Sequence, residues 1–278
     1  MTKTISTSMD CVGEGACSLR VETRGRVRWL RINRPALLNA LDRPAVHALG
    51  LALRQAQRDD RARVVVLTGT GRAFCAGADL RALGQAQAAP GDGARRAARL
   101  VDQCAALMRR LDRMSKPVLA AVNGLTVGGG LELLLCCDLI VAARSARIGD
   151  GHAKIGALPG SGASARLPRR LPSAHARFLL FSGDMLPADD PLLAALIHRV
   201  VDDGLLESAT AALADTLAAN SPLMLASVKR LLASGADATL AEALRLERQA
   251  RLRHASSFDC REGIDAFREK RAPDFQGR

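Results

Sequence analysis

The most informative stretch of the chain combines a glycine cluster with a single carboxylate. The apolar run Pro117–Val122 leads into Gly128–Gly130, and a further apolar segment follows with Glu132 at its head. Glycines between a strand and a helix let backbone N–H groups approach a ligand without a side chain in the way. The free N–H groups of a first helical turn favour negative charge, including an oxyanion that develops during a reaction. A carboxylate is costly to bury in apolar surroundings, so the stretch predicts an active site with oxyanion donors beside an acid or base.

A second glycine motif resembles a nucleotide-binding site, but the residues around it do not match one. The segment Gly160–Ala165 fits the pattern G-x-G-x-x-A, yet it follows Pro159 rather than a clear strand. No acidic residue ends a second strand at the required distance, so a Rossmann site is not expected.

Residues that bind metals are present but lack the spacing of a metal site. The seven cysteines are scattered and include no Cys-x-x-Cys pair, which favours reduced, mostly buried thiols over a disulfide scaffold or a zinc site. No metal ligands are predicted among the histidines outside the candidate site either. These are His47, His175, His198 and His254.

Length and composition indicate a globular protein. The chain has 278 residues, 48% of them apolar and 24% charged, which suits one large domain or a domain with a helical appendage. The stretch from Met1 to Cys17 has no apolar run typical of a signal peptide, and no later window approaches the ~20 apolar residues of a membrane helix. We therefore expect a cytoplasmic protein with no membrane partner.

The net charge of +12 suits a small polyanionic ligand better than nucleic acid. Only five lysines are present, so 35 of the 40 basic residues are arginine, and they are spread along the chain. Aromatic residues make up 3% of the chain and tyrosine is absent, which leaves few stacking platforms for single strands. Nucleic-acid binding is therefore not expected, although a basic surface can support it.

Hydrophobic periodicity divides the chain into three parts. Residues 1–17 are predicted to be a disordered tail, residues 18–204 an α/β core and residues 205–278 a helical module. Core strands are predicted at Ser18–Thr23, Arg26–Asn33, Val64–Thr68, Pro117–Val122 and Asp138–Ala143. Core helices are predicted at Arg43–Arg58 and Ala94–Arg113, with a mobile loop at Gly84–Gly93. The helices of the module are expected at Leu205–Ala219, Pro222–Ser234, Thr239–His254 and Asp259–Lys270.

Four separated blocks of the chain resemble the crotonase (enoyl-CoA hydratase/isomerase) superfamily in the expected order. They are Asn33–Leu41, Gly71–Leu80, Asn123–Glu132 and Phe258–Arg271. Each block alone is a weak signal, but all four in order are specific. The resemblance implies a crotonase-type ββα spiral core with a helical C-terminal trimerisation module. It also implies a homotrimer or a dimer of trimers.

The resemblance also implies a coenzyme A thioester as substrate. The backbone N–H groups of Ala78 and Gly129 would form the oxyanion hole that holds the thioester carbonyl. Coenzyme A would arrive as part of the substrate, and no permanently bound cofactor is expected. Phe267 and Lys270 match residues that reach coenzyme A in a neighbouring subunit of relatives. The complete set of coenzyme A-binding residues implied is Leu37, Ala76, Ala78, Arg81, Phe267 and Lys270.

Glu132 and His152 are the predicted catalytic residues. Hydratases of the superfamily use two glutamates around a water molecule, and Glu132 matches the first. His152 occupies the place of the second glutamate, within a block that aligns to the family without gaps. A histidine can exchange a proton near neutral pH, or it can orient substrate or serve a structural role. Asp150 is placed to orient the imidazole if the loop turns back, and is otherwise a plain turn residue.

Enoyl-CoA hydratase is the predicted function, with two alternatives kept open by the missing glutamate. One is another crotonase reaction on a coenzyme A thioester, namely an isomerase, hydrolase or decarboxylase. The other is a non-catalytic member that binds coenzyme A esters or RNA.

Overall fold

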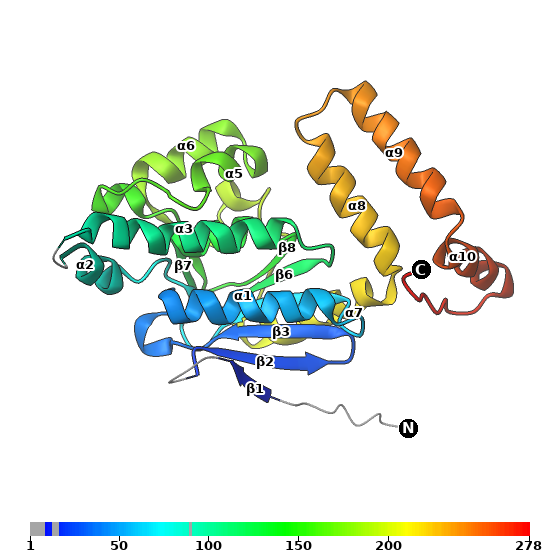
Figure 1. The fold of residues 1–278 in the computed structure, drawn as a ribbon, viewed down its shortest axis with the longest axis horizontal. Coiled ribbons are helices and arrows are strands. Elements are labelled where there is room, and N and C mark those ends of the chain that lie inside the picture. Colours follow the sequence, from blue (N-terminus) through cyan, green and yellow to red (C-terminus); the bar gives the residue numbers. More distant parts are fainter. Residues whose placement is uncertain (1–8, 13–16, 89–90) are drawn as a thin grey trace.

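The core of the molecule is a seven-stranded sheet covered by helices (Figure 1). The structure is a computed structural model that describes residues 9–12, 17–88 and 91–278. The strand order is β1-β2-β3-β4-β6-β8-β11, antiparallel up to β3 and parallel beyond it. The strands are β1 Met9–Val12, β2 Leu19–Arg24, β3 Val27–Ile32, β4 Val64–Gly69, β6 Val118–Val122, β8 Leu139–Ala143 and β11 Arg199–Val201.

A smaller sheet of four strands carries the segments that lead into the candidate site. Its order is β10-β9-β7-β5, with β10 antiparallel and the others parallel. β7 ends immediately before the glycine cluster, and β5 ends immediately before the loop that contains Ala78. The strands are β5 Ala73–Cys75, β7 Leu125–Val127, β9 Arg147–Gly149 and β10 Met185–Pro187.

Helices cover both faces of the large sheet. All residues of β4 and β6 are buried, as expected for continuous apolar runs in a parallel sheet. α1 packs against β2, β3 and α3, while α7 packs against β4, β6 and β8. The core helices are α1 Arg43–Arg58, α2 Leu80–Ala88, α3 Gly93–Asp112, α4 Gly129–Leu135, α5 Ala163–Arg170, α6 Ser173–Ser182 and α7 Leu206–Ala219. Four short 3-10 helices lie at Pro35–Leu37, His152–Ile155, Pro191–Leu193 and Asp203–Leu205.

The last three helices project from the α/β body (Figure 1). They are α8 Pro222–Gly235, α9 Leu240–Ala255 and α10 Phe258–Glu269. Large apolar side chains remain exposed on them, including Leu232 at 71%, Leu240 at 75% and Phe267 at 85%. Because α7 packs on the sheet, the departure from the core begins after α7 and not at the predicted boundary of residue 205.

Most predicted elements occur within a residue or two of their expected bounds, with two differences. Met9–Val12 form β1 and pair with β2, although they lie in the tail expected to be disordered; residues 1–8 and 13–16 of that tail lie outside the described part. The loop expected from Gly84 is helical as far as Ala88. Its alanine and glutamine residues have high helix propensity, which outweighs the single glycine at Gly84. In the described part of the chain, no helix is long and apolar enough to cross a membrane.

Four thiols are buried in the core. Burial raises the pKa of Cys75, Cys104 and Cys137 to about 12, and it raises the pKa of Cys136 as well. Cys260 on α10 is free and half-buried. Cys17 is disulfide-bonded, so the expectation of reduced thiols is wrong for this residue.

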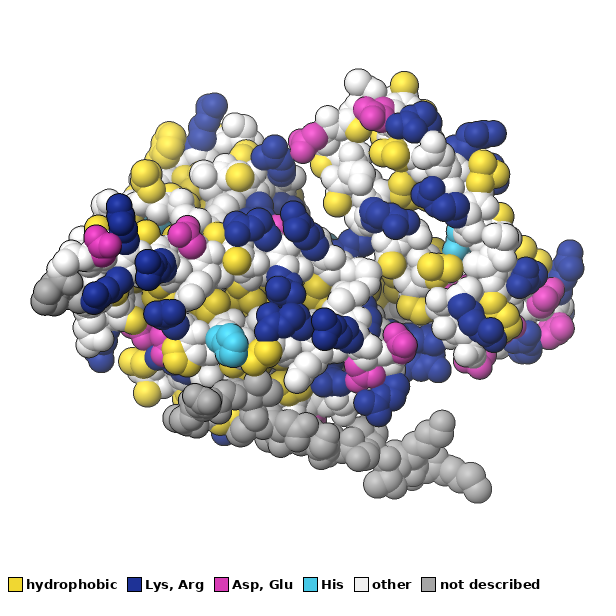
Figure 2. All heavy atoms as spheres, in the orientation of Figure 1, with side chains coloured by type: hydrophobic (Ala, Val, Ile, Leu, Met, Phe, Trp, Pro, Cys, Tyr) yellow, Lys and Arg dark blue, Asp and Glu magenta, His cyan; other side chains and the backbone are white. Residues whose placement is uncertain are grey.

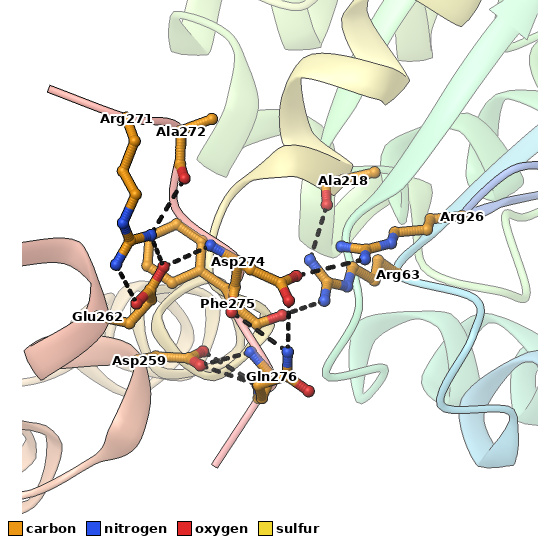
Figure 3. A network of polar contacts seen from close by, with 11 residues as sticks. Arg26, Arg63, Ala218, Asp259, Glu262, Arg271, Ala272, Asp274, Phe275 and Gln276 are labelled. Atoms are coloured by element: carbon orange, nitrogen blue, oxygen red, sulfur yellow. Dashed lines mark hydrogen bonds and ion pairs between the residues drawn. The ribbon is translucent and has the colours of Figure 1, made fainter. Parts of the chain in front are cut away.

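A buried arginine joins the C-terminal segment to the core (Figure 3). Arg63, only 9% exposed, precedes β4 and donates from Nη1 to the carbonyl of Ala218 at the end of α7, at 3.2 Å. Its Nη2 donates to the carbonyl of Phe275. One guanidinium therefore satisfies acceptors from the core and from the chain's last residues at once.

A buried carboxylate on α10 holds the same segment from the other side (Figure 3). Asp259 is 1% exposed, and its Oδ1 accepts from the N–H groups of Gln276 at 2.8 Å and Gly277 at 3.0 Å. Its Oδ2 accepts from the Ser221 hydroxyl, which also caps α8. The segment after α10 is thus fastened to α10 and to the core, and Asp259 also joins α10 to the start of α8.

Asp259→Ala is expected to destabilise the protein by about 3 kcal/mol, because several donors to one charged acceptor lose their partner. Thermal unfolding measures the loss, and hydrogen exchange should increase at residues 274–278. Asp265→Ala, which removes an exposed carboxylate from the same helix, is the matched control and should leave both unchanged. Equal behaviour of the two variants would contradict this account.

Candidate active site

Two stretches of backbone are fixed together beside the site. The N–H of Ala76 donates to Leu38 at 3.0 Å, and the N–H of Leu41 donates to Gly77 at 2.7 Å. The side chain of Asn39 is fully buried and donates to backbone carbonyls of Thr70 and Ala73, which anchors this pairing. The predicted binding residues Leu37, Ala76 and Ala78 are therefore brought into one region.

The amides of Ala78 and Gly129 lie next to each other. A Cβ placed on Gly129 would lie 3.2 Å from the Ala78 nitrogen, and one on Gly77 would lie 2.7 Å from the Gly129 nitrogen. Gly77 also has φ of +85°, a conformation that favours glycine. Within the described chain neither amide donates to another residue, so both donors remain available. An oxyanion hole at these two amides stays a prediction, with which their closeness is compatible.

The start of α4 is packed against β5 too tightly for any side chain. A Cβ on Gly130 would lie 1.9 Å from the carbonyl oxygen of Cys75. This contact fixes the first turn of α4 against the loop that carries Ala78. Glu132 follows in that turn and is therefore directed from a rigid support.

The Glu132 carboxylate is buried and hydrogen-bonded to backbone. It is 2% exposed, and its Oε1 accepts from the N–H of Ser161 at 2.7 Å and from the N–H of Ala163 at 3.1 Å. These amides lie at the N-terminal end of α5, where the helix also favours negative charge. Oε2 receives no hydrogen bond from the described residues. One oxygen is thus anchored while the other is free to act.

The second glycine motif, Gly160–Ala165, binds the Glu132 carboxylate. Ser161 and Ala163 belong to the segment that mimics a dinucleotide fingerprint, and their amides bind Glu132 instead of a phosphate. Sequence reasoning missed both residues as part of the site. One signal was available in the sequence: a glycine-rich segment begins a helix, and the N-terminus of a helix attracts a carboxylate of the same chain as readily as a bound ligand.

His152 is oriented by a buried aspartate. Its Nδ1 lies 3.0 Å from Oδ1 of Asp150, which is fully buried, and the His152 N–H donates to Oδ2 at 3.2 Å. The opposite edge of the ring faces the glycine cluster, because a Cβ on Gly128 would lie 3.7 Å from Cε1 and 3.9 Å from Nε2. The loop therefore turns back, which the sequence had left open, and Nε2 faces the backbone next to Gly129.

The electrostatic surroundings favour a protonated His152. The hydrogen bond with Asp150 raises the pKa of His152 above its ordinary value, although burial opposes the change. The negative charges of Asp150 and Glu132 raise the pKa further. Asp150 therefore both orients the His152 ring and favours its protonated form.

The remaining predicted residues lie at two separate places. Arg81 is exposed in the first turn of α2, whose N-terminus is capped by Asp79. Phe267 lies on α10 and Lys270 directly follows that helix, at the opposite end of the molecule from α2 (Figure 1). Within one chain the structure does not bring these two residues to Glu132 or His152. No group of three His, Cys, Asp or Glu in the described chain is arranged to hold a metal ion.

Comparison with known proteins identifies the class to which this fold and site belong. Residues 22–278 match the model of the enoyl-CoA hydratase/isomerase family. The chain is 37% identical over 260 residues to 2,3-dehydroadipyl-CoA hydratase of Escherichia coli K12, covering 94% of this chain and 99% of the relative. It is 37% identical over 254 residues to 1,2-epoxyphenylacetyl-CoA isomerase of the same organism, covering 91% and 95%.

A solved enoyl-CoA hydratase has the same fold. The crystal structure from Bacillus anthracis superposes with a TM-score of 0.88 at 32% identity, covering 94% of this chain and all of that one. The protein therefore belongs to the enoyl-CoA hydratase/isomerase family. The predicted crotonase fold with a helical C-terminal region is confirmed.

Asp150→Asn is expected to lower the pKa of His152, because the amide removes the charge that favours the imidazolium. The raised folded-state pKa stabilises the protein fully below the unfolded value of about 6.5, and this stabilisation fades as the pH rises through the folded-state pKa. The variant should therefore lose more thermal stability in acid than in alkaline solution. NMR titration of the ring measures the pKa directly, with His198 as an internal control that should not move. An unchanged His152 titration would refute the proposed orientation.

Proposed function

We propose that the protein hydrates the α,β double bond of an enoyl-CoA thioester. The observation that carries this proposal is the buried Glu132 carboxylate, anchored through one oxygen and set three residues after Gly129 on α4. The amides of Gly129 and Ala78 have no partner in the described chain. A buried carboxylate with one free oxygen is suited to deprotonate water. Two preorganised N–H groups stabilise charge that develops on a thioester oxygen.

The reaction divides between three groups of this chain. The thioester carbonyl accepts hydrogen bonds from the Ala78 and Gly129 amides. Glu132 removes a proton from water while the water oxygen bonds to Cβ, and the electron pair of the double bond moves toward the thioester oxygen. The resulting enolate takes a proton at Cα, which gives the 3-hydroxyacyl thioester.

His152 is the proposed donor of that Cα proton. Its Nδ1 is held by Asp150, which leaves Nε2 to face the reacting region. A raised pKa keeps a larger fraction of the ring protonated near neutral pH. The histidine thus takes over the work expected of a second carboxylic acid.

Glu132→Gln tests the base. The amide keeps the size of the side chain but cannot take a proton, so kcat for crotonyl-CoA hydration should fall by at least ~10²-fold. Loss of the enoyl-thioester absorbance follows turnover, and calorimetry with butyryl-CoA follows binding, which should survive. Glu207→Gln is the control, because Glu207 pairs with surface arginines away from the site. Wild-type turnover in the Glu132 variant would rule out its role.

His152→Ala tests the acid. If Nε2 donates the Cα proton, wild-type kcat declines as the pH rises through the His152 pKa, since the imidazolium is lost. The variant should be slower at neutral pH and should lack this decline. His152→Glu, which restores a carboxylic acid, should recover part of the rate. A wild-type profile in His152→Ala would make the residue a spectator.

Isomerisation is the second candidate reaction. The histidine at position 152 and a relative named as an isomerase favour it. In that reaction Glu132 would remove a proton from carbon and His152 would return one elsewhere, without adding water. Mass spectrometry of products from a panel of thioesters separates the two, because hydration adds the mass of one water and isomerisation adds none.

Coenzyme A binding is proposed to need a neighbouring subunit. Arg81 would meet the phosphates from the same chain, and Phe267 and Lys270 would reach the ligand of an adjacent chain. The exposed apolar side chains on α8, α9 and α10 support association with other chains, because such surface is costly in water. The number of chains proposed, three or two such trimers, rests on the family resemblance.

A further inference from the structure

A basic groove lies between α1 and α3, away from Glu132. It consists of two adjoining hollows of about 810 and 350 Å³ that share Arg54, Ala106 and Arg110 in their walls. Figure 2 shows Lys and Arg side chains over both helices, with hydrophobic side chains visible between them. No carboxylate lines either hollow. The arginines of this α1–α3 groove are Arg43, Arg54, Arg58, Arg109, Arg110 and Arg113.

The positive charge of the groove is not neutralised by the described part of the chain. None of the six arginines forms an ion pair there, whereas carboxylates on the adjoining helix ends are engaged elsewhere. Asp59 pairs with Arg28 at 2.6 Å and with Arg61 at 3.0 Å, and Asp112 pairs with Arg166. Neighbouring arginines along the groove repel one another, so an anionic partner would be favoured.

The floor of the groove is apolar and open at one position. Val46, Leu51 and Leu107 line it, together with Gly50 in the middle of α1. A glycine inside a helix costs about 0.5–1 kcal/mol relative to alanine. A Cβ at Gly50 would meet Leu107 Cδ1 at 4.0 Å, an ordinary contact, so close packing does not require the glycine. The absence of a side chain at Gly50 leaves space in the groove above its apolar floor.

We propose that the α1–α3 groove docks an acidic amphipathic helix of a partner protein. An apolar floor between two rows of arginines matches a helix with an apolar stripe flanked by carboxylates. Arg43 and Arg58 are separated by about 22 Å along α1, which corresponds to roughly four turns of a docked helix. The groove begins two residues after Leu41, so the partner would lie beside the loop that carries Ala78.

Other occupants fit the groove less well. No Phe, Tyr or Trp lines it and His47 is the one aromatic ring among the lining residues, so bases of a single-stranded nucleic acid would find little stacking surface. The same face of a second copy would bring arginines against arginines, which disfavours a symmetric dimer through this groove.

A designed peptide tests the proposal without any need for turnover. The probe is a fluorescein-labelled helical peptide of about 16 residues, with leucines on one stripe and glutamates beside it. A scrambled peptide of the same composition lacks the stripe. Fluorescence anisotropy should show binding at least tenfold tighter for the amphipathic peptide, weakening as salt is raised. Equal binding of the two peptides, or no binding of either, would overturn the proposal.

Substitutions in the groove test where the peptide binds, and whether binding depends on the arginine charges or on the apolar floor. Arg54→Glu with Arg110→Glu should abolish binding, whereas Arg177→Glu with Arg199→Glu, the same charge change on other exposed and unpaired arginines, should not. Gly50→Leu fills the floor without altering charge and should weaken binding at least tenfold. Thermal unfolding confirms that each variant is folded. Loss of the peptide signal in both charge-reversal pairs would mean a nonspecific attraction and reject the site.

Two further measurements oppose the proposal if positive. Tighter binding of a single-stranded RNA or of inorganic polyphosphate than of the amphipathic peptide would assign the groove to phosphates. A change in oligomeric mass on Arg54→Glu with Arg110→Glu, seen by light scattering, would assign it to contacts between copies of this chain.

Discussion

The close approach of two backbones at Gly77 and Gly129 is the constraint on which the site depends. No side chain fits between them, since a Cβ on Gly77 would lie 2.7 Å from the Gly129 nitrogen. The small sheet brings the two loops to this distance, because β5 and β7 are paired neighbours that end just before them. The two amides are therefore held close together by the fold itself, before any ligand binds.

A second constraint follows from where Glu132 stands. Its carboxylate would be expensive to bury alone, but two amides at the start of α5 solvate it with fixed dipoles. The same contact fixes α4 relative to α5. A change at the start of α5 would therefore alter the position of the Glu132 carboxylate as well as local stability.

The sequence predicted the parts of the molecule that depend on local patterns. α1 occurs at its predicted bounds because Asp42 caps it and its apolar residues recur with helical spacing. Glu132 and the glycine cluster were recognisable because their chemistry is concentrated in one segment. Ser161 and Ala163 were not, since they contribute backbone amides and any residue type has those. The contact of Asp150 with His152 depends on how a loop turns, and the sequence left that open.

The small sheet was also beyond prediction, because its strands are only three residues long and show no periodicity. The family resemblance supplied predictions that local sequence patterns did not, including the pairing of the Ala78 and Gly129 amides. It did not supply the arginine groove, which depends on two helices that are far apart in sequence and adjacent in space.

The uneven burial of the thiols has a practical consequence for spectroscopy. Cys75, Cys104, Cys136 and Cys137 are shielded by the core and resist ionisation, so alkylating reagents will react with them slowly. Cys260, half-buried on α10, is the more accessible of the free cysteines in the described chain. A maleimide dye attached there would sit on a projecting helix and report its surroundings, while the interior of the molecule stays unlabelled.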